Sequence, residues 1–197
     1  MLLGKRGGFL GLQRQIYELV APNLFPCNLS GLFVSRLTKL FPLVELEIKF
    51  TDWRLVCKQL KRCSMHVSMC VAKTYVNAWA TTHRYHEQHR LTCILGCKGA
   101  DDTLAHYIDC ARLWRVVARH SPEYCRGTVL EKLGLKDPHP ERFKNISVAF
   151  TVYHALKMSH RELIESALHT RRFHELAEEA KRQAAVANNF LSSLIPK

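Results

Sequence analysis

Four potential metal ligands lie close together near the middle of the chain, and they constrain its fold more than any other feature. Cys93, Cys97, His106 and Cys110 form the pattern C-x3-C-x8-H-x3-C within 18 residues. Three thiolates and one imidazole are a standard tetrahedral ligand set for zinc, and four protein ligands leave no open position for a catalytic water. The pattern therefore predicts a structural Zn²⁺ site, and the chain must fold so that the four side chains meet.

The residues between these ligands suit such a site. Gly96 and Gly99 allow the chain to turn tightly around an ion. A helix beginning near Leu104 would be preceded by three residues that favour N-caps, namely Asp101, Asp102 and Thr103. On that helix His106 and Cys110 are four residues apart and share one face. We therefore expect a CCHC zinc knuckle followed by a helix, embedded in a larger domain.

Chance is the competing explanation, because the chain contains 8 Cys and 11 His. Chance would also have to place the glycines and the capping residues. Without a secretory signal, the other cysteines are expected to be free thiols. His83, His86 and His89 form a second possible cluster, but on a helix its outer members point apart. We interpret it as a solvated polar stretch.

The chain is strongly basic. Lys and Arg number 29 against 17 Asp and Glu, which gives a net charge of +12. The excess is largest over residues 51–92, with 7 basic and 2 acidic residues. A basic surface attracts polyanions, and RNA or DNA is the commonest polyanion inside cells.

One amphipathic helix is expected to begin after Thr51 and Asp52, which can act as its N-cap. Its apolar positions recur at helical spacing, and they are Trp53, Val56, Leu60, Cys63, Val67 and Cys70. The opposite face carries four cations that could lie along a phosphate backbone, Arg54, Lys58, Lys61 and Arg62. The alternative is a solvated charged face. Cys63 and Cys70 lie on the apolar side and are interpreted as core residues.

The remaining pattern predicts a mostly α fold. Further helices are expected over 12–20, 32–40, 104–120, 145–158 and 159–194, with a loop over 121–142 and a strand over 43–50. We divide the chain into a poorly defined N-terminal segment (1–50), a basic helix with a zinc-binding module (51–120), and a loop with C-terminal helices (121–197). No apolar stretch is long enough to span a membrane, so an intracellular protein of the cytoplasm or nucleus is expected.

A family resemblance emerges around the ligands. The run from Trp79 to His86, followed by the four ligands, Asp102 and Trp114, resembles the zinc-binding region that follows the polymerase in non-long-terminal-repeat retrotransposon reverse transcriptases. The resemblance covers residues 76–115, and the first two cysteines are spaced more widely than is usual in that family. It implies that this chain is the C-terminal part of such an enzyme and grips nucleic acid. Further phosphate contacts are then expected from Arg84, Arg90 and Lys98, with Trp79 and Tyr85 as stacking or core residues.

No catalytic centre is recognisable. A polymerase needs paired carboxylates that hold metal ions, but Asp101 and Asp102 lie inside the zinc loop and are interpreted as helix caps. The chain lacks the phosphate-binding GxxxxGK and nucleophilic GxSxG motifs. We therefore expect a binding protein and not an enzyme. Two alternatives stay open: a zinc-stapled protein-interaction domain whose C-terminal helix packs on a partner, and a nuclease relic that uses a strand over Glu47–Lys49.

Overall fold

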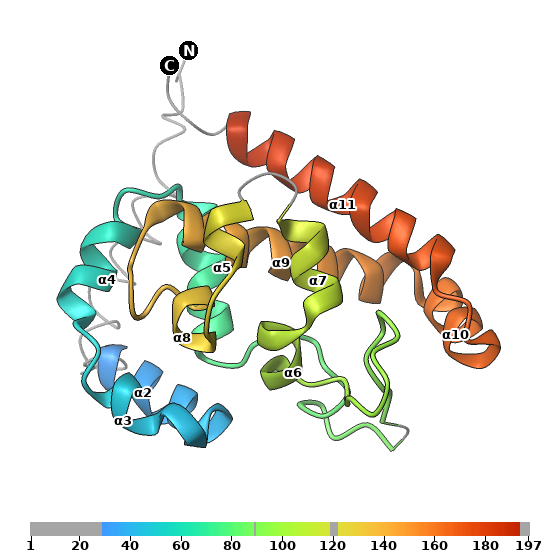
Figure 1. The fold of residues 1–197 in the computed structure, drawn as a ribbon, viewed down its shortest axis with the longest axis horizontal. Coiled ribbons are helices and arrows are strands. Elements are labelled where there is room, and N and C mark those ends of the chain that lie inside the picture. The colour runs from blue at the N-terminus through green and yellow to red at the C-terminus, as the bar shows by residue number, and fades with distance from the viewer. Residues whose placement is uncertain (1–28, 89, 119–121, 194–197) are drawn as a thin grey trace, which may run out of the picture. The chain divides into compact units, whose positions relative to one another are not determined.

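The computed structural model describes residues 29–88, 90–118 and 122–193 (Figure 1). The chain divides into two compact units, residues 1–32 and 33–197, and only residues 29–32 of the first are described. The helix expected over 12–20 lies outside the described residues. The described part contains no β-strand, so the mostly α prediction is confirmed.

Most of the helices are joined by short connections. In chain order the helices are α2 (Leu29–Leu40), the 3₁₀ helix η1 (Pro42–Val44), α3 (Glu45–Lys49), α4 (Trp53–Leu60), α5 (Met65–Tyr75), α6 (Leu104–Asp109), α7 (Ala111–Val117), the 3₁₀ helix η2 (Pro122–Cys125), α8 (Val129–Lys132), α9 (Pro140–Ser159), α10 (Arg161–Thr170) and α11 (His174–Ser193). Helices α5 and α6 are separated by the long segment 76–103, in which the described residues form no helix. None of the described helices is long and apolar enough to cross a membrane.

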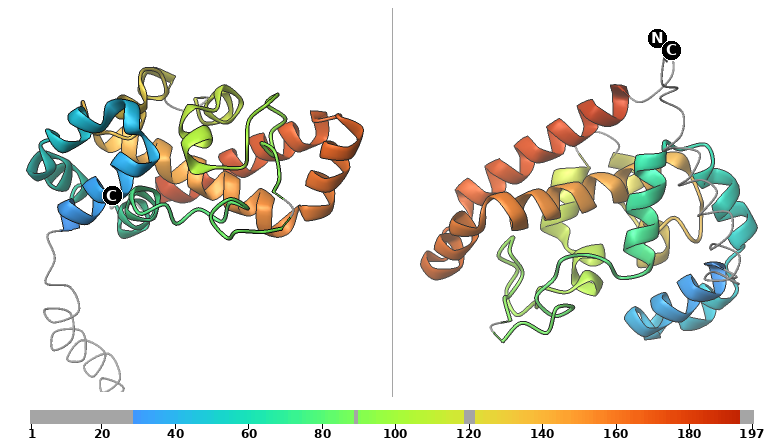
Figure 2. Two further views of the ribbon diagram at one scale, coloured as in Figure 1. Left: turned by 90° about the horizontal axis from the view of Figure 1, so that it is seen from below. Right: turned by 180° about the vertical axis from the view of Figure 1, so that it is seen from behind.

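Helix α9 forms the centre of the second unit. It packs against α5 and α11, and α11 runs alongside it in both views of Figure 2. Because α9 contacts other elements on several sides, it is buried around most of its circumference, including at Phe143, Val148 and Tyr153. Helix α11 buries a stripe of apolar residues at helical spacing, namely Leu176, Ala180, Ala184, Ala187 and Leu191. This stripe is therefore used within the chain, against α9.

The single basic helix expected from residue 53 is two helices. Asp52 caps α4 as predicted, since its carboxylate accepts hydrogen bonds from the backbone N–H groups of Arg54 and Leu55. The chain then leaves the helix after Leu60, and Ser64 starts α5 by accepting a hydrogen bond from the N–H of Val67. A second N-cap within the predicted helix therefore ends it. Of the two cysteines predicted for the core, Cys70 is buried and Cys63 is half-buried.

Three more predictions of local structure are corrected. The strand expected over 43–50 is η1 and α3, in which only Ile48 is buried. The helix expected over 159–194 is interrupted at Arg171, whose left-handed backbone (φ 59°) ends α10. The loop expected over 121–142 contains η2, α8 and the start of α9. The spacing of apolar residues did not reveal where these helices begin and end, because one helix follows another after only a few residues.

Candidate metal centre

The first two ligands lie on an irregular hairpin. The backbone N–H of Cys93 donates to the carbonyl of Ala100 at 2.7 Å, and the N–H of Asp102 donates to the carbonyl of Leu91 at 3.0 Å. Gly96 turns the chain with φ +83°, and its N–H donates to the carbonyl of Cys93 at 2.9 Å. The expected tight turn is therefore present, and it brings Cys97 back toward Cys93.

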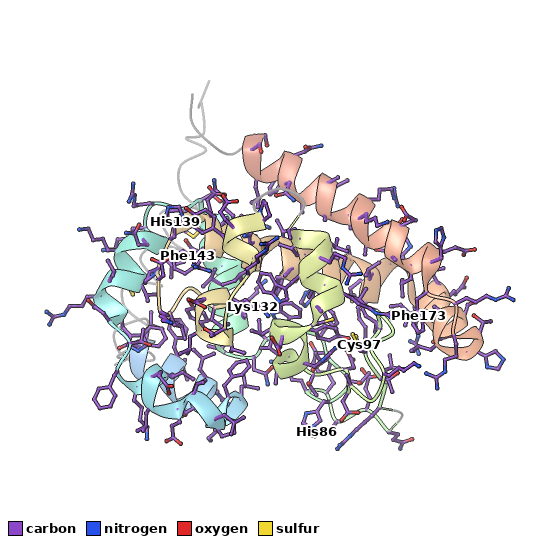
Figure 3. All side chains as sticks on the ribbon, in the orientation of Figure 1. His86, Cys97, Lys132, His139, Phe143 and Phe173 are labelled. Atoms are coloured by element: carbon purple, nitrogen blue, oxygen red, sulfur yellow. The ribbon has the colours of Figure 1, made fainter. Side chains whose placement is uncertain are left out.

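The turn between α10 and α11 covers this hairpin. Phe173, from that turn, lies beside Cys97 in Figure 3. A Cβ atom built on Gly96 would lie 2.6 Å from the Phe173 ring. Two independent features therefore require glycine at position 96: its left-handed backbone conformation and the close approach of the Phe173 ring.

The other two ligands come from the junction of α6 and α7. Thr103 caps α6 as predicted, because its hydroxyl accepts a hydrogen bond from the N–H of His106 at 3.2 Å. Cys110 does not share a helix with His106, contrary to the prediction of one helix over 104–120. Its extended backbone (φ −65°, ψ 103°) ends α6 and starts α7. The change of direction at Cys110 brings its sulfur to the His106 ring.

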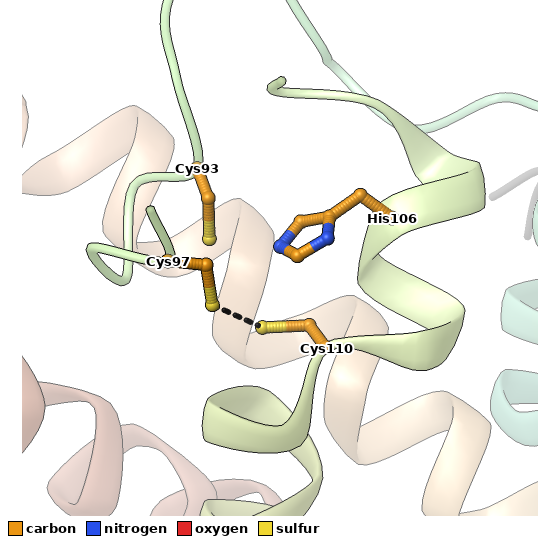
Figure 4. Close-up of side chains that lie close together, drawn as sticks. All are labelled: Cys93, Cys97, His106 and Cys110. Atoms are coloured by element: carbon orange, nitrogen blue, oxygen red, sulfur yellow. Dashed lines mark hydrogen bonds between the residues drawn. The ribbon is translucent and has the colours of Figure 1, made fainter. Parts of the chain in front are cut away.

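The four side chains converge on one point (Figure 4). Their ligand atoms all lie within 4.8 Å of one another. The sulfur atoms of Cys97 and Cys110 are 3.6 Å apart, far beyond the ~2.05 Å length of a disulfide bond. A tetrahedron with metal–sulfur bonds of about 2.3 Å has edges of about 3.8 Å. The separation therefore matches a shared metal ion.

The histidine nitrogen that faces the sulfurs needs a partner. Figure 4 shows the His106 ring pointing toward the three cysteines. Its Nε2 atom is buried and has no hydrogen-bond partner among the described residues. A buried polar atom without a partner costs about 1–3 kcal/mol, and binding a metal ion would remove this cost. The group of Cys93, Cys97, His106 and Cys110 could hold a metal ion.

Within the cluster the thiolate form is favoured at Cys93, whereas burial raises the pKa of Cys97. The Cys110 thiol, and to a lesser extent the His106 side chain and the backbone N–H groups of Cys97 and Leu95, lower the pKa of Cys93 against the effect of its burial. The interaction with Cys93 in turn raises the pKa of Cys110. Because cysteine binds metals as the thiolate, stabilising a negative sulfur suits a cation site.

No protein-family model, curated protein or solved structure matches the chain. The resemblance to the retrotransposon zinc region therefore rests on residues 76–115 alone.

Asp102 holds the hairpin to the rest of the fold and does not cap α6, which corrects its predicted role. It is completely buried. Oδ1 accepts hydrogen bonds from the hydroxyls of Tyr107 (2.8 Å) and Tyr153 (3.0 Å), and Oδ2 accepts from the N–H of Thr82 (2.8 Å) and from Lys157 Nζ (3.0 Å). Its partners on α9 are more than 50 residues away in sequence, so local patterns gave no signal for this role.

The two aromatic residues predicted to stack on bases or lie in the core, Trp79 and Tyr85, differ in their exposure. Trp79 is completely buried and stacks on Tyr107, with ring centroids 5.9 Å apart, so its interpretation as a core residue is confirmed. Tyr85 is 58% exposed, and the guanidinium of Arg84 lies 5.3 Å from its ring. His83 and His86 are exposed and join no metal cluster of described residues, whereas His89 lies outside them.

All seven residues predicted to contact phosphates are exposed. Arg54 and Lys58 lie on α4, Lys61 and Arg62 follow it, Arg84 and Arg90 precede the hairpin, and Lys98 lies in the hairpin. Within the described residues none of the seven forms an ion pair with a carboxylate. Their charges are therefore not neutralised by described acidic side chains.

Proposed function

We propose that this chain is a zinc-stabilised nucleic-acid-binding module without a catalytic centre, comparable with the region that follows the polymerase in non-long-terminal-repeat retrotransposon reverse transcriptases. The observation that carries the proposal is the convergence of three cysteines on a buried histidine nitrogen that lacks any other partner. Thiolate and imidazole ligands in this proportion favour zinc over the hard cations magnesium and calcium.

Zinc would have a structural role in this module. Cys93, Cys97, His106 and Cys110 would hold the ion and complete its four-fold coordination. Zinc bound in this way stabilises small modules by about 10–16 kcal/mol. The only adjacent aspartates do not suggest a second, catalytic ion site, since Asp101 is exposed whereas Asp102 is buried among four hydrogen-bond donors.

Metal analysis tests the first half of the proposal. The purified chain should contain about one zinc ion per molecule, as structural zinc sites do. Cys97→Ser and Cys110→Ser should each lose the ion, because each variant removes one of four ligands. Cys57→Ser is the matched control, since this thiol is exposed and outside the cluster. Full zinc occupancy in both ligand variants would contradict the assignment.

Nucleic-acid binding is supported by the charge distribution. The chain carries a net charge of +12, and the seven predicted contact residues have no carboxylate partners among the described residues. Each phosphate that such a cation neutralises releases a condensed counterion, so affinity for RNA or DNA should fall as salt concentration rises.

The dependence of affinity on salt concentration tests this second half. Replacing Arg54, Lys58, Lys61 and Arg62 by Gln should flatten the slope of log affinity against log salt by roughly 3 if all four contact phosphates. A matched control replaces four cations that already have carboxylate partners, Lys49, Lys136, Arg161 and Arg182. The control should change the slope much less. An unchanged slope in the first variant, with normal zinc content and helicity, would refute the proposed interface.

A second candidate function is a zinc-stapled protein-interaction domain. Exposed apolar side chains on η1, α3 and the residue after α3 favour it, since Leu43 is 97%, Leu46 66% and Phe50 86% exposed. Contiguous exposed apolar surface commonly marks a site of protein association. Under this alternative the chain would bind no nucleic acid, and replacing Leu43 and Phe50 by Ser would abolish binding of a protein partner.

A further inference from the structure

A cavity of about 380 Å³ lies beside the candidate metal centre, between the hairpin, α7 and the first half of α11. Three of its lining side chains are cationic: Arg112 and Arg115 from α7, and Lys181 from α11. No carboxylate of the described residues lines it, although Lys181 forms an ion pair with Glu178 one turn earlier on α11. The cavity therefore suits an anionic group.

The rest of the lining is apolar. It includes Leu95 from the hairpin, Val116 from α7, Phe173 from the turn before α11, and Leu176 from α11 itself. The volume falls within the range of about 300–1,000 Å³ that small-molecule sites occupy. A ligand that matches both parts of the lining is anionic at one end and flat and apolar at the other. A nucleotide has this form, with its phosphate at one end and its base at the other.

Arg112 connects the cavity to the candidate metal centre. Its Nη1 donates a hydrogen bond to the carbonyl of Leu95 at 2.8 Å, within the hairpin segment that joins Cys93 to Cys97. Its guanidinium also lies 5.9 Å from the centroid of the Phe173 ring, and that ring packs against Gly96. The hairpin that carries Cys93 and Cys97 thus forms one wall of the cavity through Leu95.

We propose that this cavity binds one unstacked nucleotide of a single-stranded RNA or DNA, with Arg115 and Lys181 contacting its phosphate and the apolar wall contacting its base. The inference rests on the nucleic-acid-binding function proposed above and names the form of nucleic acid that is bound. A base in a duplex is stacked and paired, and removing it costs a few kcal/mol. A pocket with room for one nucleotide therefore favours single strands over duplexes.

The test uses the full zinc-loaded chain and the fluorescence anisotropy of a labelled oligonucleotide, presented as a single strand and as a duplex. The double variant Arg115→Gln, Lys181→Gln should bind the single strand about tenfold or more weakly, the loss expected for a charge-assisted hydrogen bond. Its salt slope should fall by about 0.7 for the shared phosphate. The matched control Arg126→Gln, Lys136→Gln removes two charges from residues that do not line the cavity, and it should bind almost normally.

A second variant tests the apolar wall without changing any charge. Ala177→Phe would fill the cavity, because Ala177 lines it. It should weaken binding of the single strand and leave weak duplex binding unaltered. Zinc content and circular dichroism like those of the wild type establish that each variant is folded.

The outcomes separate the two proposals. If the wild type binds neither RNA nor DNA, the proposed function fails and this inference fails with it. If the wild type binds but the double variant loses no more affinity than its control, only the cavity assignment is overturned. Equal losses for single strand and duplex refute the requirement for an unstacked base. A free mononucleotide that binds as tightly as the oligonucleotide would refute a strand as the occupant.

Discussion

Replacing Asp102 by Asn keeps the shape of a completely buried side chain but removes its charge and two of its acceptor positions. The carboxylate accepts four hydrogen bonds, two at each oxygen. If the new amide group faces Thr82 and Lys157, it opposes two donors. If it faces the tyrosines, Tyr153 can still donate to the carbonyl of Ala80 at 3.0 Å, but the hydroxyl proton of Tyr107 loses its acceptor. In either orientation Lys157 loses its carboxylate partner.

The size of the loss follows from the burial of this ion pair. Removing one partner of a buried pair costs about 3–5 kcal/mol, because it leaves the other charge without compensation. Lys157 keeps 14% of its side chain exposed, so water lessens the penalty and the lower limit applies. We expect the free energy of unfolding to fall by about 3 kcal/mol. A residue that only capped a helix would cost about 1 kcal/mol.

Urea unfolding followed by circular dichroism, at saturating zinc, measures this loss. Thr103→Ala is the internal standard, because Thr103 is the residue that caps α6. It should cost about 1 kcal/mol. Adding Lys157→Met to Asp102→Asn should restore part of the stability, since the unpaired ammonium is then absent. If Asp102→Asn costs no more than Thr103→Ala, the central role assigned to this carboxylate is wrong.

Two further predictions concern a buried histidine and the glycines of the hairpin. Burial lowers the pKa of His154, and its Nε2 accepts a hydrogen bond from the N–H of Ala80, so the folded state holds this ring neutral. Stability should therefore fall as pH drops below the ordinary histidine value of about 6.5, by at most about 1.4 kcal/mol per pH unit for this group. Urea unfolding between pH 7 and pH 5 should show this slope, and the slope should be smaller in His154→Gln. Gly96→Ala should reduce both stability and zinc retention, because the new methyl group would meet the Phe173 ring. Gly99→Ala has open space around the methyl group and should cost only about 1–2 kcal/mol for its left-handed backbone; equal effects of the two alanine variants would contradict the packing of Phe173.

The sequence predicted which four side chains would meet, because the signal for them is local. Four residues of the right chemistry, glycines at the turn and a threonine before the helix all lie within one short segment. The same kind of local signal identified Asp52 as the N-cap of α4. Periodicity could not locate the break at Cys110, because helical residues lie directly on both sides of it. For the same reason, the spacing of apolar residues did not reveal the turn at Arg171.

The interactions that support the site could not be predicted from local patterns. Asp102 looked like one more capping residue, and only the folded chain brings Tyr153 and Lys157 to it. The residues around Phe173 in the sequence do not indicate that its ring contacts Gly96, which lies far away along the chain. Arg112, Arg115 and Lys181 come from two helices, and their meeting at one cavity is a property of tertiary packing.

The separation in sequence between the ligands and the partners of Asp102 implies an order of folding. The ligands span 18 residues, whereas the hydrogen bond from Tyr153 to Asp102 joins residues 51 positions apart. Closing the longer loop costs about 1 kcal/mol more in chain entropy. All four cluster residues precede α9 in the chain, so during synthesis they emerge from the ribosome before any residue of α9 does. If the cluster binds zinc as proposed, the hairpin would capture the ion first, and α9 would then dock onto a carboxylate that the metal-bound segment already holds in place.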